Sequence, residues 1–131
     1  MDARKREYSM DINRYWKAAL AQQPEEMKAF FQEDASINWH NTNEHFTVDE
    51  FIRANCEYPG KWGGEIERIE QVGNLIITVV HVYSLDQEVS CHAVSFIEVE
   101  SDKIASMDEY WGDDGSAPLW RLDKHIGTPI L

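Results

Sequence analysis

The chain has 131 residues, of which 43% are hydrophobic and 11% aromatic, a composition typical of a folded domain rather than a disordered chain. Its 12 basic and 24 acidic residues give a net charge of −12, which opposes binding to the phosphates of nucleic acid. No apolar run approaches the ~20 residues of a membrane helix, and the basic start Met1–Arg6 leads into no apolar stretch. We therefore expect one cytoplasmic domain over 1–131, with no nucleic-acid or membrane partner and with Cys56 and Cys91 as reduced thiols.

The first part of the chain has the pattern of helices. Apolar residues at helical spacing predict a first helix, which Ser9 can cap. A second, short helix begins at Pro24, because proline suits the first helical position. Its buried stripe would consist of Met27, Phe30 and Phe31.

A strand and a third helix follow. Alternating apolar and polar residues predict a strand over 34–40, and polar residues predict a loop over 41–46. Thr47 and Glu50 have the spacing of a capping box, so a helix begins there and ends before Pro59.

The second half of the chain has the pattern of strands joined by short turns. We expect strands over 64–72, 75–85, 88–100 and 103–113, joined by two-residue turns that suit hairpins. The first of these strands does not alternate cleanly, which a β-bulge would explain. Helices followed by a meander sheet define an α+β architecture.

The turn lengths fix which residues lie opposite one another. With two-residue turns, His81 faces His92, His92 faces Trp111, and Val94 faces Glu109. One face of the sheet would then carry apolar side chains at one end and the titratable side chains His81, His92 and Glu109 at the other. Such a face, packed against helices, requires a cavity or mutual hydrogen bonds, so we expect a pocket for a small molecule.

Three residues of this face are candidates for catalysis. Glu109 is the first choice for a general acid or base, because burial would raise its pKa; alternatively, it pairs with His92 only to satisfy the core. His81 and His92 could move protons or could be a hydrogen-bonded core pair. The three together could also bind a metal, although we expect neither metal nor cofactor.

Aromatic residues are the main candidates for the pocket wall. The loop after the first strand would form the rim, and Trp62 could be a lid, a dimer contact or part of the core. The expected ligand-binding residues are Trp16, Trp39, His40, Asn43, Trp62, Tyr83, Val94 and Trp111.

Three segments resemble a known superfamily. Arg14–Leu20, Phe30–Ile37 and Asp102–Asp113 are similar to the nuclear transport factor 2-like superfamily, which includes the SnoaL-like and ketosteroid-isomerase-like proteins. The resemblance implies a cone-shaped fold, in which N-terminal helices pack on a strongly curved, mostly antiparallel sheet. It also implies a homodimer formed through the opposite sheet face, to which Asp108 and Tyr110 would point.

The resemblance bears on individual positions. In the isomerase, the general-base Asp occupies a position near Trp39 of this chain, and the oxyanion-hole Asp a position near Val94. The isomerase's helix Tyr corresponds to Trp16. Because Trp39 cannot accept a proton and Val94 cannot donate one, the isomerase mechanism is not carried over. Glu109 matches a carboxylate that SnoaL-like cyclases and limonene-epoxide-hydrolase-like members carry before the Tyr of the last strand. The hydrolases' Arg-x-Asp pair is replaced by His-Val-Tyr at 81–83.

Two functions remain open at this point. The chain could be a cofactor-independent isomerase, cyclase or dehydratase acting on a small apolar or aromatic substrate. It could instead be a non-catalytic ligand-binding or association module. The segment 117–131 is too apolar to hang free, so it would dock on its own cone or on a partner.

Overall fold

The computed structural model describes residues 10–131, so the proposed Ser9 cap and the basic segment Met1–Arg6 lie outside it. The helices are α1 (Ile12–Leu20), α2 (Pro24–Lys28), α3 (Val48–Cys56) and α4 (Leu119–Asp123). The strands are β1 (Phe31–Trp39), β2 (Glu44–Thr47), β3 (Trp62–Val72), β4 (Leu75–Ser84), β5 (Ser90–Glu100) and β6 (Lys103–Asp113). The predicted order of helices, strand, helix and meander is confirmed.

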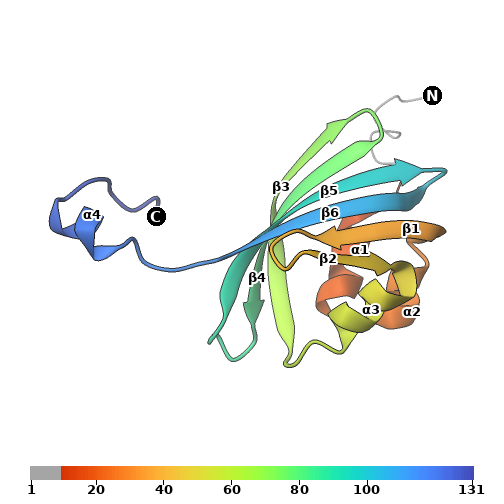
Figure 1. Cartoon of the computed structure of the whole chain (residues 1–131), viewed down its shortest axis with the longest axis horizontal. Coiled ribbons are helices and arrows are strands. Elements are labelled where there is room, and N and C mark those ends of the chain that lie inside the picture. Colours follow the sequence, from red (N-terminus) through yellow and green to blue (C-terminus); the bar gives the residue numbers. More distant parts are fainter. Residues whose placement is uncertain (1–9) are drawn as a thin grey trace.

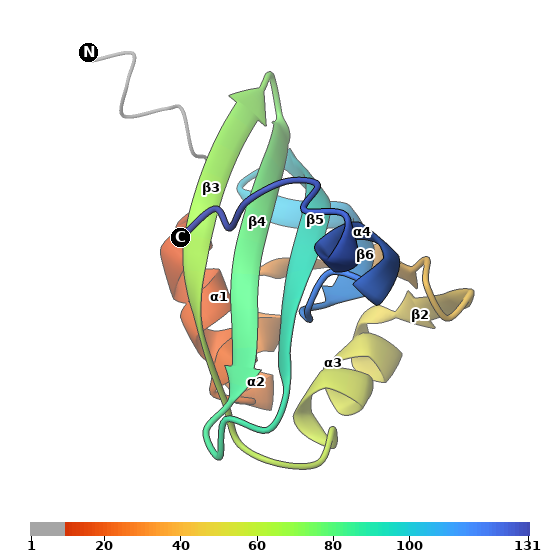
Figure 2. The same cartoon turned by 90° about the vertical axis from the view of Figure 1, so that its left-hand side faces the viewer.

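The six strands form one curved sheet in the order β2-β1-β6-β5-β4-β3. All neighbours are antiparallel except β1 and β6. Helices α1, α2 and α3 cover one face, called here the inner face (Figure 1). The other, outer face of β3, β4 and β5 is seen from the front in Figure 2. The architecture is therefore the expected α+β cone, with its core between the inner face and the helices.

The helix starts follow local capping chemistry. The side chain of Asp11 caps α1 by accepting from the amide of Arg14 at 3.1 Å. The capping box of α3 is formed as predicted: the Thr47 amide donates to Glu50 at 2.9 Å, and the Glu50 amide donates to Thr47 Oγ1 at 3.3 Å. These contacts satisfy amides that the first helical turn leaves free.

The prediction was wrong between α2 and β2. Helix α2 begins at Pro24 but ends at Lys28, and Phe31 already belongs to β1, where it pairs with Ile104. Phe30 and Phe31 are thus not part of a helical stripe. The predicted loop over 41–46 contains the start of β2, which pairs with β1 after a turn at Asn43. Backbone pairing with β1 outweighs the polar character of these residues.

The β3–β4 pair and the β5–β6 pair each contain a β-bulge. The bulge expected in β3 is confirmed, because the register shifts between Ile66 and Arg68. The strand begins at Trp62, two residues before the predicted start. Gly64 allows a close approach to β4, since a Cβ there would lie 2.5 Å from the carbonyl oxygen of His81.

The second bulge overturns the predicted register of β5 and β6. The turn itself pairs Glu100 with Lys103 as predicted, but the register shifts by one beyond Val99. Ser95 therefore faces Glu109, whereas Val94 had been expected there. A shift of one residue moves a side chain to the other face of the sheet.

The shifted register changes which face each residue occupies. In β4 and β5 the buried, inward residues are those such as Thr78, Ala93 and Ser95, whereas His81 and His92 point outward. Their pairing with each other is confirmed. Among residues 10–131, no helix has the length and apolar character needed to cross a bilayer.

Candidate functional site

A cavity of about 410 Å³ lies between the inner face of the sheet and the helices. This volume falls within the range of small-molecule sites. The four tryptophans named from the sequence as candidates for a pocket wall lie along this cavity. The complete lining is Trp16, Ala19, Leu20, Gln22, Trp39, Asn41, Thr42, Asn55, Tyr58, Trp62, Val82, Val89, Cys91, Trp111 and Asp113.

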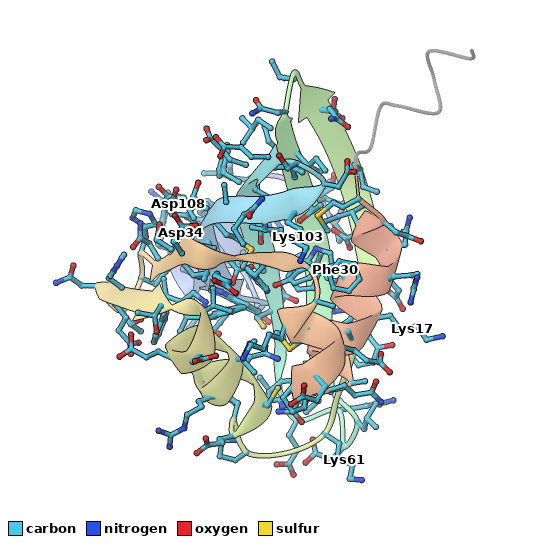
Figure 3. All side chains as sticks on the ribbon, turned by 90° about the vertical axis from the view of Figure 1, so that its right-hand side faces the viewer. Lys17, Phe30, Asp34, Lys61, Lys103 and Asp108 are labelled. Carbon is cyan, nitrogen blue, oxygen red and sulfur yellow. The ribbon has the colours of Figure 1, made fainter. Side chains whose placement is uncertain are left out.

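Among residues 10–131, no basic side chain lines the cavity, and the single carboxyl group that does so belongs to Asp113 at the end of β6. Lys17 and Lys61 point away from the body, as Figure 3 shows. With a net charge of −12 on the chain, the cavity disfavours anionic ligands.

Glu109 lies on the inner face but behind the cavity wall. Its side chain is 1% exposed and accepts hydrogen bonds from Trp39 Nε1 at 2.9 Å and from Ser95 Oγ at 2.5 Å. Burial raises the pKa of this carboxyl group, and the two hydrogen bonds partly offset that rise. The indole of Trp39 therefore connects the buried acid to the cavity that it lines.

A second wall tryptophan is fixed in the same way. Trp16 Nε1 donates to Thr78 Oγ1 at 3.1 Å, and Thr78, Ser95 and Glu109 form one row across β4, β5 and β6. Both indoles thus direct their polar edge into a buried polar row. Their hydrogen bonds hold the rings in place and leave the aromatic surfaces to the cavity.

Trp111 differs from these two residues. Its backbone amide donates to Asn41 Oδ1 at 2.7 Å, but its buried Nε1 has no hydrogen-bond partner within the described chain. A buried indole N–H usually finds an acceptor. Trp111 lines the cavity, so a ligand atom could supply that acceptor once the side chains that cover Nε1 move aside.

The expected catalytic triad of side chains does not form. The bulge in β6 leaves Glu109 facing inward, whereas His81 and His92 stack on the outer face with ring centroids 5.0 Å apart. The sequence-based prediction that the three converge is therefore wrong. The two-histidine, one-carboxylate metal site considered from the sequence fails for the same reason.

The outer histidines belong to a network of acidic groups. His92 contacts Asp114 at 2.5 Å and Glu67 at 3.1 Å, and its pKa is raised, chiefly by the hydrogen bond to Asp114. His81 contacts Ser90 at 2.9 Å. The bulge in β3 contributes here, because it brings Glu67 within reach of His92 on this face.

The remaining predicted ligand-binding residues lie away from the cavity. The loop after β1 does contribute to the wall, but through Asn41 and Thr42. His40 stacks on Tyr110 with ring centroids 4.3 Å apart and contacts Asp108 at 2.7 Å. The others are Asn43, which is exposed in a turn, and Tyr83 and Val94, which point outward on β4 and β5.

Sequence reasoning missed several wall residues and the partners of Glu109. Gln22, Asn55 and Tyr58 come from helix ends, where no periodic pattern marks a cavity. Ser95 was missed because the register was wrong. The alternation Ile97-Glu98-Val99-Glu100 contained the signal, since it assigns the odd-numbered positions of this strand to the inner face.

Comparison with solved structures identifies the fold. An NTF-2 like protein of unknown function from Burkholderia xenovorans LB400 is 25% identical, with a TM-score of 0.72 over 86% of this chain and 88% of that one. A proposed ketosteroid isomerase from Kribbella flavida DSM 17836 is 22% identical, with a TM-score of 0.76 over 92% and 87%. An LEH-like epoxide hydrolase from M. tuberculosis is 12% identical, with a TM-score of 0.64 over 88% and 85%.

These similarities define a protein with the nuclear transport factor 2-like fold, as the sequence motifs indicated. No family model matches the sequence, and no curated protein matches it. One fold can carry unrelated functions, so the function must be argued from the cavity.

Proposed function

We propose that the chain binds a small, uncharged, ring-bearing molecule that carries a hydrogen-bond acceptor. The observation that supports this most directly is the cavity of about 410 Å³ walled by Trp16, Trp39, Trp62 and Trp111. Indole rings offer large apolar surfaces that stack on aromatic ligands. The acceptor would face the free Nε1 of Trp111.

The positions of the titratable groups favour binding over catalysis. His81 and His92 lie on the outer face, and Glu109 is enclosed behind Trp39. The remaining cavity carboxylate, Asp113, is exposed at the strand end. A general acid or base must reach the proton that it transfers, and neither the histidines nor Glu109 lines the cavity.

Calorimetry with benzophenone tests the proposal. Benzophenone has two rings and one carbonyl acceptor, and we expect saturable binding with one site per chain. Val89→Trp should abolish binding, because Val89 lines the cavity and a larger side chain would fill it. Val72→Trp is the matched control, since Val72 is exposed at the end of β3 and does not line the cavity, so it should leave affinity unchanged. Equal binding to both variants would contradict the proposal.

The charge of the ligand is tested separately with 4-benzoylbenzoate. This compound keeps the ketone and both rings but adds a carboxylate. We expect it to bind at least about tenfold more weakly than benzophenone, because the described part of the cavity wall offers no cation to pair with it. Equal affinities would show that the cavity tolerates anions.

A second candidate function is acid–base catalysis through Glu109. Its burial favours this reading, because burial raises the pKa of Glu109 and so favours the protonated form, which can donate a proton. It requires the Trp39 indole to move so that substrate reaches the acid. Compounds that bind would be incubated with wild type and with Glu109→Gln. Turnover by wild type alone would support catalysis, and no product from either protein would leave binding as the function.

A further inference from the structure

Two carboxamide side chains give the cavity a polar region on its helix side. Gln22 closely follows α1, Asn55 lies in the last turn of α3, and both residues line the cavity. These helices cover the inner face of the sheet, as Figure 1 shows. A ligand held between the sheet and the helices would therefore contact amide groups as well as indole rings.

The orientation of both amides is fixed by hydrogen bonds that join α1 to α3. Gln22 Nε2 donates to the backbone carbonyl oxygens of Asn55 at 3.0 Å and of Tyr58 at 2.9 Å. Asn55 Nδ2 donates to the carbonyl oxygen of Ala19 at 2.9 Å. Helix ends leave their last carbonyls without intrahelical partners, and a carbonyl can only accept. The NH₂ group of each amide must therefore face the backbone.

The oxygen atom of each amide is left free. Among residues 10–131, Gln22 Oε1 and Asn55 Oδ1 accept no hydrogen bond. Both side chains are half-buried, and neither oxygen belongs to the buried atoms that lack a partner. The two oxygens are therefore accessible, in contrast to the covered Nε1 of Trp111. They can accept from a group that enters the cavity.

The backbone of Gln22 shows that this side chain is held against strain. Its φ angle of 55° lies in the left-handed region, which glycine or asparagine usually occupies after a helix. A glycine there would remove the strain, but it would also remove both hydrogen bonds to the end of α3. The strained position therefore holds the Gln22 amide against α3 and beside the cavity.

The sheet side of the cavity contains a third carboxamide with the opposite polarity. Asn41 Oδ1 accepts from the backbone amide of Trp111 at 2.7 Å, so its NH₂ group is the one without a partner in the described chain. Asn41 lines the cavity as well. The wall thus presents a free donor from the sheet side and two free acceptors from the helix side, in addition to the exposed carboxylate of Asp113.

We infer that Gln22 and Asn55 are specificity-determining residues and that the ligand of this cavity carries an uncharged hydrogen-bond donor, a ring amine or a ring hydroxyl. This inference rests on the proposed function, because it describes the ligand of the same cavity. An apolar group beside the two amides would separate their oxygens from water without replacing the lost hydrogen bonds, which weakens binding. A donor in the same place replaces those bonds.

Calorimetry with three compounds of nearly the same shape tests the inference. 4-Aminobenzophenone and 4-hydroxybenzophenone carry a donor where 4-methylbenzophenone has a methyl group of similar size. We expect wild type to bind the amine or the hydroxyl compound at least about fivefold more tightly than the methyl compound, which corresponds to one net hydrogen bond. The tighter of the two identifies the donor. Equal affinity for all three would overturn this inference and leave the proposed function in place, whereas no binding of any of them would contradict both.

Variants of similar size assign the preference to the two amides. Gln22→Met and Asn55→Leu remove the amide oxygen, and each should reduce the ratio of donor-compound to methyl-compound affinity by at least about twofold. Gln71→Met is the matched control, because Gln71 Nε2 also donates to a backbone carbonyl, that of Gly73 at 2.9 Å, but Gln71 does not line the cavity. The ratio is measured on one protein, so a general loss of stability cancels. An unchanged ratio in both Gln22→Met and Asn55→Leu would overturn the assignment.

A spectroscopic measurement on wild type detects the contact itself. With ¹³C in the glutamine side-chain carbonyls, the signal of Gln22 is assigned through its own NH₂ protons. We expect this signal to lie downfield in the complex with the preferred donor compound, relative to the complex with 4-methylbenzophenone, because accepting a hydrogen bond deshields a carbonyl carbon. Gln71 is the internal reference and should show no such difference. A Gln22 signal at the same position in both complexes would overturn its assigned role.

Discussion

Trp39 Nε1 donates a 2.9 Å hydrogen bond to the carboxyl group of Glu109, which is 1% exposed. The same indole lines the cavity. The contact therefore gives one residue two roles, as a partner of a buried acid and as a wall of the ligand site. It also explains why Glu109 can be at the centre of the fold and yet outside the cavity.

Replacing Glu109 by Gln should change how stability depends on pH. The folded pKa of Glu109 is raised by burial. Above its unfolded pKa of about 4.3, the unfolded chain loses this proton first, so stability falls with rising pH by at most about 1.4 kcal/mol per pH unit until the folded pKa is reached. Gln cannot ionise, so the variant should gain stability relative to wild type over that interval.

Urea unfolding at a series of pH values measures this difference. Glu98→Gln is the control, because it removes an exposed carboxylate from the outer side of β5 and should not reproduce the slope. A constant difference between Glu109→Gln and wild type from about pH 4 to pH 8 would contradict the raised pKa.

Trp111→Phe should remove the preference for a carbonyl ligand. Benzophenone and 1,1-diphenylethylene have nearly the same shape, but only the ketone accepts a hydrogen bond. Wild type should bind the ketone more tightly by about 1 kcal/mol, or about fivefold, because the free Nε1 gains an acceptor. Calorimetry on the variant should give equal affinities, and a preference that persists would assign the acceptor contact to another residue.

Gly64→Ala should destabilise the contact between β3 and β4. A Cβ at this position would lie 2.5 Å from the His81 carbonyl oxygen and 3.1 Å from a methyl group of Leu20. We expect a loss of about 1–3 kcal/mol in unfolding free energy. Gly112→Ala is the control, because its Cβ would meet no atom within 4 Å; equal losses for the two variants would mean that close packing is not the cause.

Asp114→Asn should lower the pKa of His92. Asp114 is the largest cause of the raised pKa, and Glu67 contributes as well. Since that pKa is raised on folding, its contribution to stability is complete below about pH 6.5 and is lost as pH rises through the folded value. The ring is partly exposed, so we expect less than about 1 kcal/mol.

Nuclear magnetic resonance titration of the histidine side chains measures the pKa of His92 directly. Asp123→Asn in α4 is the control, since it removes an acidic residue that has no contact with His92. A titration curve of His92 that Asp114→Asn leaves unchanged would be inconsistent with the observed contact.

The sequence was sufficient for the class of fold and for much of the pocket wall. Capping chemistry located α3 through Thr47 and Glu50, and broken alternation located the bulge in β3. The tryptophans were found because large aromatic residues between a sheet and helices must be core or cavity wall, and the four chosen line the cavity.

The sequence was insufficient to predict the bulge between β5 and β6, which decides the face of the sheet that Glu109 occupies. Residues at both parities of β4 are apolar, as Ile76 and Ile77 illustrate, so alternation did not assign a face. The bulge at Ala105 of β6, opposite Glu98 and Val99, lies in a stretch with no glycine to mark it. That single shift separated His81 and His92 from Glu109, and with them the predicted catalytic centre.

The most direct test of the proposed site follows the indole Nε1–H resonances of the five tryptophans during titration with benzophenone. Trp111→Phe and Trp120→Phe assign the two signals that matter. We predict a saturable downfield shift of the Trp111 signal, because its free N–H gains an acceptor, and no comparable shift of Trp120 in α4. A Trp111 signal that does not move at saturation, or one that moves no more than Trp120, would contradict the proposal that this cavity is the ligand site.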